Sequence, residues 1–228
     1  MNPPLTLQAI HDRLLSAYGP QGWWPADSTF EMMVGAILTQ NTSWTNVEAA
    51  IANLKAAGLL DARAIAACDE GQLATAIRPS GYYNQKAQKL KIFADFYLGH
   101  GGEPGLRTLA RPRQVLLALH GIGPETADSM LLYALERPVF VIDAYTRRIF
   151  SRLGATSPEA SYHALQDYFH SGLPASLALF KEYHALIVMH AKHHCRTRPV
   201  CAGCPLQDGC AHALDSETAN IQQSSECA

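Results

Sequence analysis

Four cysteines close together near the end of the chain could bind a metal centre. Cys195, Cys201, Cys204 and Cys210 lie within sixteen residues, with five, two and five residues between successive members. Four thiolates suit either a tetrahedral zinc ion or a [4Fe–4S] cluster. Zinc sites commonly use two C-x2-C pairs, and this run has only one. The spacing therefore favours an iron–sulfur cluster and leaves zinc as the alternative.

A second stretch able to do chemistry is "LHGIGPETAD", residues 119–128. Gly121 and Gly123 before Pro124 predict a tight turn between two helices, and Glu125 then falls in the first turn of the second helix. A turn of this kind presents backbone N–H groups and a helix N-terminus, which together can hold a DNA phosphate without reading sequence. An ordinary turn between helices is the alternative.

A third candidate is Asp143 in "VIDAYTRR". It follows an apolar run and precedes a helix expected over residues 144–153, so its simplest role is to cap that helix. A carboxylate held beside a sugar can also stabilise positive charge at C1′ and orient an attacking water, as in glycoside hydrolysis. Both roles remain open from the residues alone.

The elements that must position these groups are helical. Apolar residues recur at helical spacing, and the only β-branched run, "PVFVID", is short. We expect "GHGGEPG" to be a loop and residues 211–228 to be a disordered tail. The pattern predicts an all-α chain with two lobes, one over 26–132 and the other over 1–25 plus 133–210. Helices are expected over about 29–39, 43–58, 61–67, 70–77, 83–98, 113–119, 125–135, 144–153, 158–170 and 174–194.

Composition narrows the class of protein. The chain has 228 residues, of which 48% are hydrophobic and 17% charged, as in ordinary globular proteins. No apolar run is long enough to cross a membrane and the N-terminus does not read as a signal peptide, so we expect a cytoplasmic protein without membrane contact. The net charge is −2. Basic residues nevertheless gather over 78–113, where they could contact nucleic acid.

Taken together and in order, "LHGIGPETAD", "VIDAYTRR" and the four cysteines resemble the helix-hairpin-helix DNA glycosylase superfamily, in its endonuclease III branch. The resemblance extends upstream through "GAILTQNTSWTNVEAAI" and "SGYYNQKAQKL", and is nearest to the 3-methyladenine glycosylase-like subgroup. It implies a two-lobed all-α fold with a C-terminal [4Fe–4S] loop. The first cysteine interval is five residues here and six in the family's usual pattern.

The resemblance also implies roles for particular residues. Asp143 matches the essential aspartate, Gln40 matches the glutamine that fills the gap left by a flipped nucleotide, and Tyr82 falls at the second wedge position. The remaining implied positions are the DNA-binding Gly121, Gly123 and Thr126, the base-pocket residues Phe30, Trp44 and Tyr145, and the cluster ligands Cys195, Cys201, Cys204 and Cys210.

Two departures from relatives decide the expected reaction. Glu125 stands where bifunctional endonuclease III-type enzymes have the lysine that forms a Schiff base, and Gly35 stands where the adenine-mismatch glycosylase has its catalytic glutamate. A carboxylate cannot form an imine with the sugar. The resemblance thus implies a monofunctional, monomeric glycosylase of base excision repair, acting on double-stranded DNA with a damaged base. Glu125 would be either a second acid or a charge favoured at a helix N-terminus.

The damaged base could be a deaminated one, such as hypoxanthine or uracil, or an alkylated purine. The sequence leaves two other functions open. One is a bifunctional glycosylase with AP lyase activity, and the other is a non-catalytic iron–sulfur protein that binds damaged DNA. An inert reader of DNA would not need a carboxylate at Asp143.

Overall fold

The computed structural model describes residues 5–214, in which all regular secondary structure is helical and no β-strand occurs. The all-α prediction is confirmed. The chain divides into two compact units. One, Trp24–Pro138, is called the hairpin unit; the other, called the cysteine unit, joins the described residues of Met1–Trp23 to those of Val139–Ala228. The lobe expected over residues 26–132 corresponds to the hairpin unit, which spans Trp24–Pro138.

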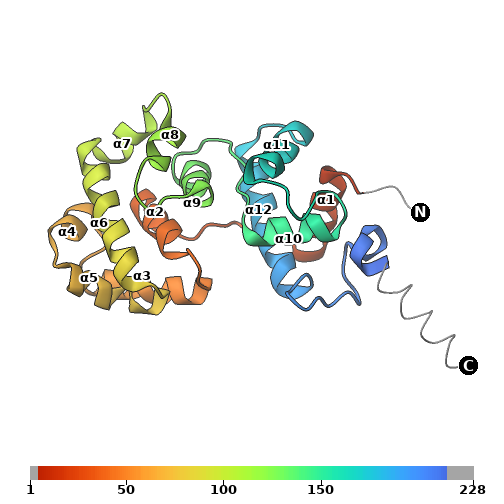
Figure 1. Cartoon of the computed structure of the whole chain (residues 1–228), viewed down its shortest axis with the longest axis horizontal. Coiled ribbons are helices and arrows are strands. Elements are labelled where there is room, and N and C mark those ends of the chain that lie inside the picture. The colour runs from red at the N-terminus through yellow and green to blue at the C-terminus, as the bar shows by residue number, and fades with distance from the viewer. Residues whose placement is uncertain (1–4, 215–228) are drawn as a thin grey trace, which may run out of the picture. The chain divides into compact units, whose positions relative to one another are not determined.

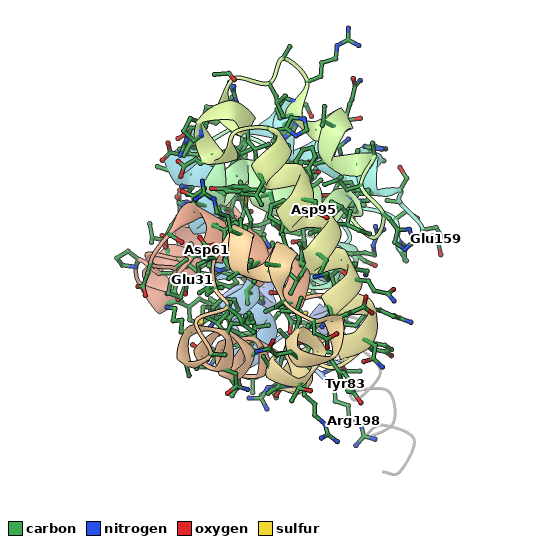
Figure 2. All side chains as sticks on the ribbon, turned by 90° about the vertical axis from the view of Figure 1, so that its left-hand side faces the viewer. Glu31, Asp61, Tyr83, Asp95, Glu159 and Arg198 are labelled. Carbon is green, nitrogen blue, oxygen red and sulfur yellow. The ribbon has the colours of Figure 1, made fainter. Side chains whose placement is uncertain are left out.

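The two longest helices of the hairpin unit are α3 (Trp44–Ala56) and α6 (Tyr83–Gly99) (Figure 1). Its core helix α2 is buried on nearly every face, and the long helix α6 packs against α4 and α5. Figure 2 shows Tyr83 at the beginning of α6 and Asp95 farther along the same helix. The elements are α2 (Thr29–Leu38), α3 (Trp44–Ala56), α4 (Ala62–Ala67), α5 (Glu70–Ala76), the 3-10 turn η1 (Arg78–Ser80), α6 (Tyr83–Gly99), α7 (Gly102–Arg107), α8 (Pro112–Leu117), α9 (Pro124–Ser129) and a π-helical turn η2 (Met130–Ala134).

Local capping explains where several of these helices begin. The side chains of Ser28, Asp61 and Asp69 accept hydrogen bonds from backbone N–H groups in the first turns of α2, α4 and α5. Helices α8 and α9 instead start with Pro112 and Pro124, whose missing N–H group would have no partner in a first turn.

A buried ion pair joins the two helices of the hairpin. Nε and Nη2 of Arg113 on α8 donate to the two carboxylate oxygens of Asp128 on α9, at 2.7 and 3.0 Å, and the Asp128 side chain is fully buried. Gly121 lies in the turn between the helices with a φ of 81°, a conformation that glycine adopts without strain. The predicted hairpin between two helices is therefore present, and the ion pair holds its helices together.

Lys86 is a second buried cation in the hairpin unit. Its Nζ donates to the carbonyl oxygens of Leu38, at the end of α2, and Ser80, at the end of η1, at 2.8 and 2.6 Å. Burial, with a smaller contribution from Lys89, lowers the pKa of Lys86 to about 8. The ends of α2 and η1 are thus held to the start of α6.

The cysteine unit has an aromatic core. Phe140 stacks on Phe169 with ring centroids 3.8 Å apart, and Phe150, Phe180 and Tyr183 complete the cluster. The hydroxyl of Tyr183 donates to a backbone carbonyl at the start of the first helix, which attaches that helix to the core. The elements are α1 (Leu7–Tyr18), α10 (Ala144–Arg152), α11 (Tyr162–Gly172), α12 (Leu177–His193) and the 3-10 turn η3 (Gln207–Gly209).

Three local expectations differ from the structure. The stretch expected as a loop, residues 99–105, overlaps α7 (Gly102–Arg107), whose Leu106 lies just beyond that stretch and is buried. Helix α11 begins at Tyr162 rather than 158, because Ser161 provides the cap. Residues 211–214, the start of the tail expected to be disordered, are helical, and the rest of that tail lies outside the described residues.

None of the helices within residues 5–214 has the length and apolar character needed to cross a lipid bilayer.

The brace between α8 and α9 generates a stability prediction. Replacing Arg113 with Met leaves the buried Asp128 carboxylate without its bidentate partner, which should lower the free energy of unfolding by about 3 kcal/mol. Urea denaturation measures this change. Arg111→Met is the matched control, because Arg111 is exposed and its loss should change stability by less than about 0.5 kcal/mol. Equal effects of the two substitutions would contradict the brace.

Candidate functional site

Asp143 is fixed at the start of α10. Its Oδ1 accepts hydrogen bonds from the backbone N–H of Thr146 at 2.6 Å and from the Thr146 hydroxyl at 2.7 Å. The expected capping role is confirmed by this geometry. Because Oδ1 accepts both capping bonds, the orientation of the carboxylate is fixed. The Asp143 side chain is 12% exposed.

The segment before Asp143, residues 138–142, has no regular secondary structure and pairs with no strand. The backbone N–H of Phe140 donates to Nε2 of His170 at 2.9 Å, and Nε2 of Gln166 donates to the Phe140 carbonyl at 2.8 Å. The Ile142 N–H donates to the Tyr162 hydroxyl at 3.3 Å. Side chains of α11 therefore satisfy the backbone groups that a neighbouring strand would otherwise satisfy.

His184 faces the second oxygen of Asp143. Its Nε2 lies 3.6 Å from Oδ2, its side chain is 5% exposed, and the Trp23 indole stacks on its ring with centroids 5.7 Å apart and planes 5° apart. Burial alone would raise the pKa of Asp143, but His184 and the bonds from Thr146 outweigh it and hold that pKa below its ordinary value. The site therefore keeps a largely buried carboxylate ionised.

The sequence alone assigned no role to His184, which lies beside Asp143 in the structure. The only local signal is that His184 begins an apolar stretch of α12, "HALIV", where a polar ring on the buried side needs a partner.

Three of the predicted DNA-contacting residues, Gln40, Gly121 and Thr126, are brought together. Nε2 of Gln40 donates to the Gly121 carbonyl at 3.0 Å and to the Thr126 hydroxyl at 2.9 Å. Glu125 is exposed in the first turn of α9. Gly123 is exposed, and a Cβ atom placed on it would meet no atom within 4 Å, so its backbone is uncovered.

Tyr82 combines a strained backbone conformation with an exposed side chain. It precedes α6 with a φ of 48°, in the left-handed region that tyrosine rarely adopts, and is 64% exposed. Such strain persists where surrounding structure enforces it, often at functional positions.

The predicted base-pocket residues are not all brought together. Trp44 meets Trp24 edge-on with centroids 5.0 Å apart, and the two indoles line a hollow of about 310 Å³ that Gly35 also lines. Phe30 does not line this hollow; it is buried against the aromatic rings of α6. Tyr145 belongs to the cysteine unit, where the Arg148 guanidinium lies 5.1 Å from its ring centroid.

The four clustered cysteines line one hollow. Its walls are otherwise largely apolar, from residues such as Ile149, Val200 and Leu206. Among residues 5–214, no three His, Cys, Asp or Glu side chains are close enough together to hold a single metal ion. The donor set, four thiols facing one sheltered space, fits a larger thiolate-bound group better than one zinc ion, which needs every sulfur about 2.3 Å from one point.

Arginines of α10 hold the cysteine loop. Nε of Arg148 donates to the Cys195 carbonyl at 2.8 Å, while Arg152 donates to the carbonyls of Arg196 and Thr197 and to the Cys195 sulfur at 3.4 Å. These arginines thus connect the loop to the helix that Asp143 caps.

Comparisons with known proteins agree with this fold. Residues 34–175 match the model of the HhH-GPD superfamily of base excision DNA repair proteins. A Methanocaldococcus jannaschii protein named "Putative DNA repair glycosylase" is 48% identical over 208 residues, which cover 88% of this chain and 94% of the relative. Endonuclease III of Sulfolobus acidocaldarius is 30% identical over 193 residues, covering 83% of this chain and 84% of the relative.

Solved structures give the same result. The Helicobacter pylori 3-methyladenine DNA glycosylase MagIII, bound to 1,N6-ethenoadenine, matches with a TM-score of 0.74 and 30% identity, covering 82% of this chain and 98% of that one. An endonuclease III–DNA complex matches in fold with a TM-score of 0.81 at 20% identity, covering 94% and 99%. The chain belongs to the HhH-GPD superfamily of base excision DNA repair proteins. It is a DNA N-glycosylase whose partner is DNA, as the resemblance implied.

The contact between His184 and Asp143 generates a titration prediction. His184→Phe keeps an aromatic ring beneath Trp23 but leaves burial unopposed by the histidine, so the pKa of Asp143 should rise. The ionised form would then be lost at a higher pH as the solution is acidified. The ¹³C shift of the Asp143 carboxyl, followed against pH, measures this. His163→Phe, an exposed change on α11, should leave it unmoved; an unchanged titration in His184→Phe would show that the histidine does not lower the pKa of Asp143.

Proposed function

We propose that the protein is a monofunctional glycosylase that removes a damaged base by hydrolysis with a water activated by Asp143. The observation that carries this proposal is the ionised, largely buried Asp143 carboxylate, held by Thr146 and facing His184. Preorganised negative charge of this kind stabilises the positive charge that develops at C1′ as the glycosidic bond breaks. A water oxygen then bonds to C1′, and its proton balances the charge of the departing base.

Glu125 supports the absence of lyase chemistry. A lyase reaction needs an amine to displace the base and form an imine with the sugar, which a carboxylate cannot do. We propose that Glu125 protonates or contacts the leaving base. Its charge is also favoured in the first turn of α9, because the N-terminus of a helix carries partial positive charge.

We propose that the base is an alkylated purine or a deaminated base such as hypoxanthine or uracil. The hollow beside Trp24 and Trp44 offers aromatic faces to a flat ring, and stacking on such faces tolerates many bases. The likeness to a glycosylase bound to 1,N6-ethenoadenine supports an alkylated purine. Phe30 is proposed to support the wall of this hollow from the core side, and Tyr145 is proposed separately as a base-contacting residue of the cysteine unit.

DNA contact is proposed to involve Gln40 and Tyr82 as wedges and Gly121, Gly123 and Thr126 as part of the phosphate grip. The exposed, strained Tyr82 supports a wedge role, and the open space at Gly123 supports close approach of a phosphate. We further propose that the enzyme acts as a monomer on double-stranded DNA.

We propose that Cys195, Cys201, Cys204 and Cys210 hold a [4Fe–4S] cluster. Their four thiols line one hollow, and curated relatives include endonuclease III enzymes. When bound, such a cluster would cross-link the loop, because its iron atoms bond all four sulfurs. The bonds from Arg148 and Arg152 would then carry that rigidity to α10.

Changing Asp143 tests the proposed reaction. Asp143→Asn keeps an oxygen for the cap but removes the charge, so excision should slow by about 10²- to 10³-fold while DNA binding persists. Rates would be measured on duplexes carrying hypoxanthine, uracil or an alkylated purine, which also identifies the base. An undiminished rate on the preferred lesion would exclude Asp143 as the catalytic carboxylate.

Product analysis separates the monofunctional reaction from a lyase. Wild-type protein should leave an abasic strand that breaks only after alkali, and borohydride should trap no covalent adduct. Efficient trapping would show that another amine of the protein forms an imine with the sugar.

A Glu125→Gln variant tests the role of Glu125. Excision should be slower if Glu125 acts as an acid, whereas a wild-type rate would limit its role to the charge at the helix N-terminus.

The cluster proposal makes a spectroscopic prediction. Protein purified without oxygen should be brown, absorb near 400 nm and contain roughly four irons per chain. Cys204→Ser should lower both the iron content and the unfolding temperature, whereas Cys68→Ser, on a cysteine outside the cluster, should change neither. Colourless protein containing one zinc ion per chain would show that the four cysteines bind zinc rather than an iron–sulfur cluster.

A further inference from the structure

The amide of Gln40 is bonded at both ends within the hairpin unit. The Nζ of Lys89, on α6, donates to the Gln40 Oε1 at 2.5 Å, while Nε2 donates to Gly121 and Thr126 of the hairpin. Lysine can only donate, so the oxygen of the amide must face α6 and its nitrogen must face the hairpin. The side chain expected to enter DNA therefore has one defined orientation before DNA is present.

The stem of Lys89 lies against the hairpin turn. A side-chain carbon placed on Gly121 would lie 2.5 Å from Cε of Lys89 and 2.7 Å from its Cδ and Cγ. The lysine methylenes therefore cross the turn at the point where glycine leaves space for them. Gly121 thus has a second reason to be glycine besides its positive φ.

Helix α6 contacts both proposed wedge segments. Lys86, one turn before Lys89, bonds the carbonyls of Leu38 and Ser80, two residues before Gln40 and Tyr82 respectively. Lys86 thereby fixes the backbone leading to each wedge, while Lys89 fixes the Gln40 side chain. Lys86 is buried and cannot reach DNA, whereas Lys89 is only half-buried.

We propose that Lys89 is a positioning residue for base flipping, which holds the Gln40 amide against the hairpin so that the wedge and the phosphate grip act as one unit. This rests on the proposed DNA-binding roles of Gln40 and the hairpin. Without Lys89, Oε1 loses a charge-assisted hydrogen bond, and the glutamine must be ordered when the duplex opens. Lys89 acts on insertion through Gln40, rather than as another phosphate contact.

The experiment uses the full chain and a duplex in which 2-aminopurine lies opposite a tetrahydrofuran abasic analogue. The fluorescence of 2-aminopurine reports insertion of the Gln40 side chain into the gap opposite it. Lys89→Met should weaken the insertion equilibrium by about tenfold, and Lys89→Arg should restore most of it. Affinity for an undamaged duplex should fall only as expected for one lost charge, with a salt slope smaller by at most about 0.9. Matching thermal unfolding temperatures establish that each variant is folded.

A double-mutant comparison decides whether Lys89 acts through Gln40. In a Gln40→Ala background, Lys89→Met should have no further effect on insertion. Independent effects of the two changes, or an equal loss on damaged and undamaged duplexes from Lys89→Met, would overturn the proposal. An insertion signal unaffected by Gln40→Ala would overturn it as well. The abasic analogue needs no catalysis, so these outcomes are separate from failure of the Asp143 reaction.

Discussion

The ends of short helices impose the constraint on which this structure depends. A six-residue helix leaves as many backbone groups unpaired at its ends as a long one, and each buried group needs a partner. Long cationic side chains supply many of them: Lys86 bonds two carbonyls, and Lys91 bonds those of Ile65, Ala66 and Cys68. Charges that would otherwise be solvated thus fix loops from inside.

The same constraint explains why the candidate functional groups are also structural. Asp143 caps α10 with the carboxylate proposed to face the sugar, and Gln40 bonds the carbonyl of the hairpin glycine. Groups held in this way are oriented before a ligand arrives, which lowers the cost of ordering them later. Folding and function therefore share hydrogen bonds at these positions.

The sequence predicts what is encoded locally. Capping residues such as Ser28 and Asp143 predict where helices begin, because their hydrogen-bond partners lie only three residues farther along the chain. Contacts between distant segments are not readable in this way: His184 meets Asp143 from another helix, and Phe30 turns to the rings of α6 rather than to Trp44. Helix α7 was missed because its glycines resemble a loop, although burial of Leu106 offsets the cost of ordering that segment.

The hydrogen bonds of the stretch before Asp143 determine which sequence changes the protein can tolerate there. Strands paired in a sheet can shift by two residues and recover the same pattern of bonds. Here Phe140 and Ile142 each bond a different side chain of α11, so no shifted alignment repeats the original. This stretch should accept changes of residue type more readily than a change of length, since one inserted or deleted residue would mismatch every bond and move the carboxylate off its helix.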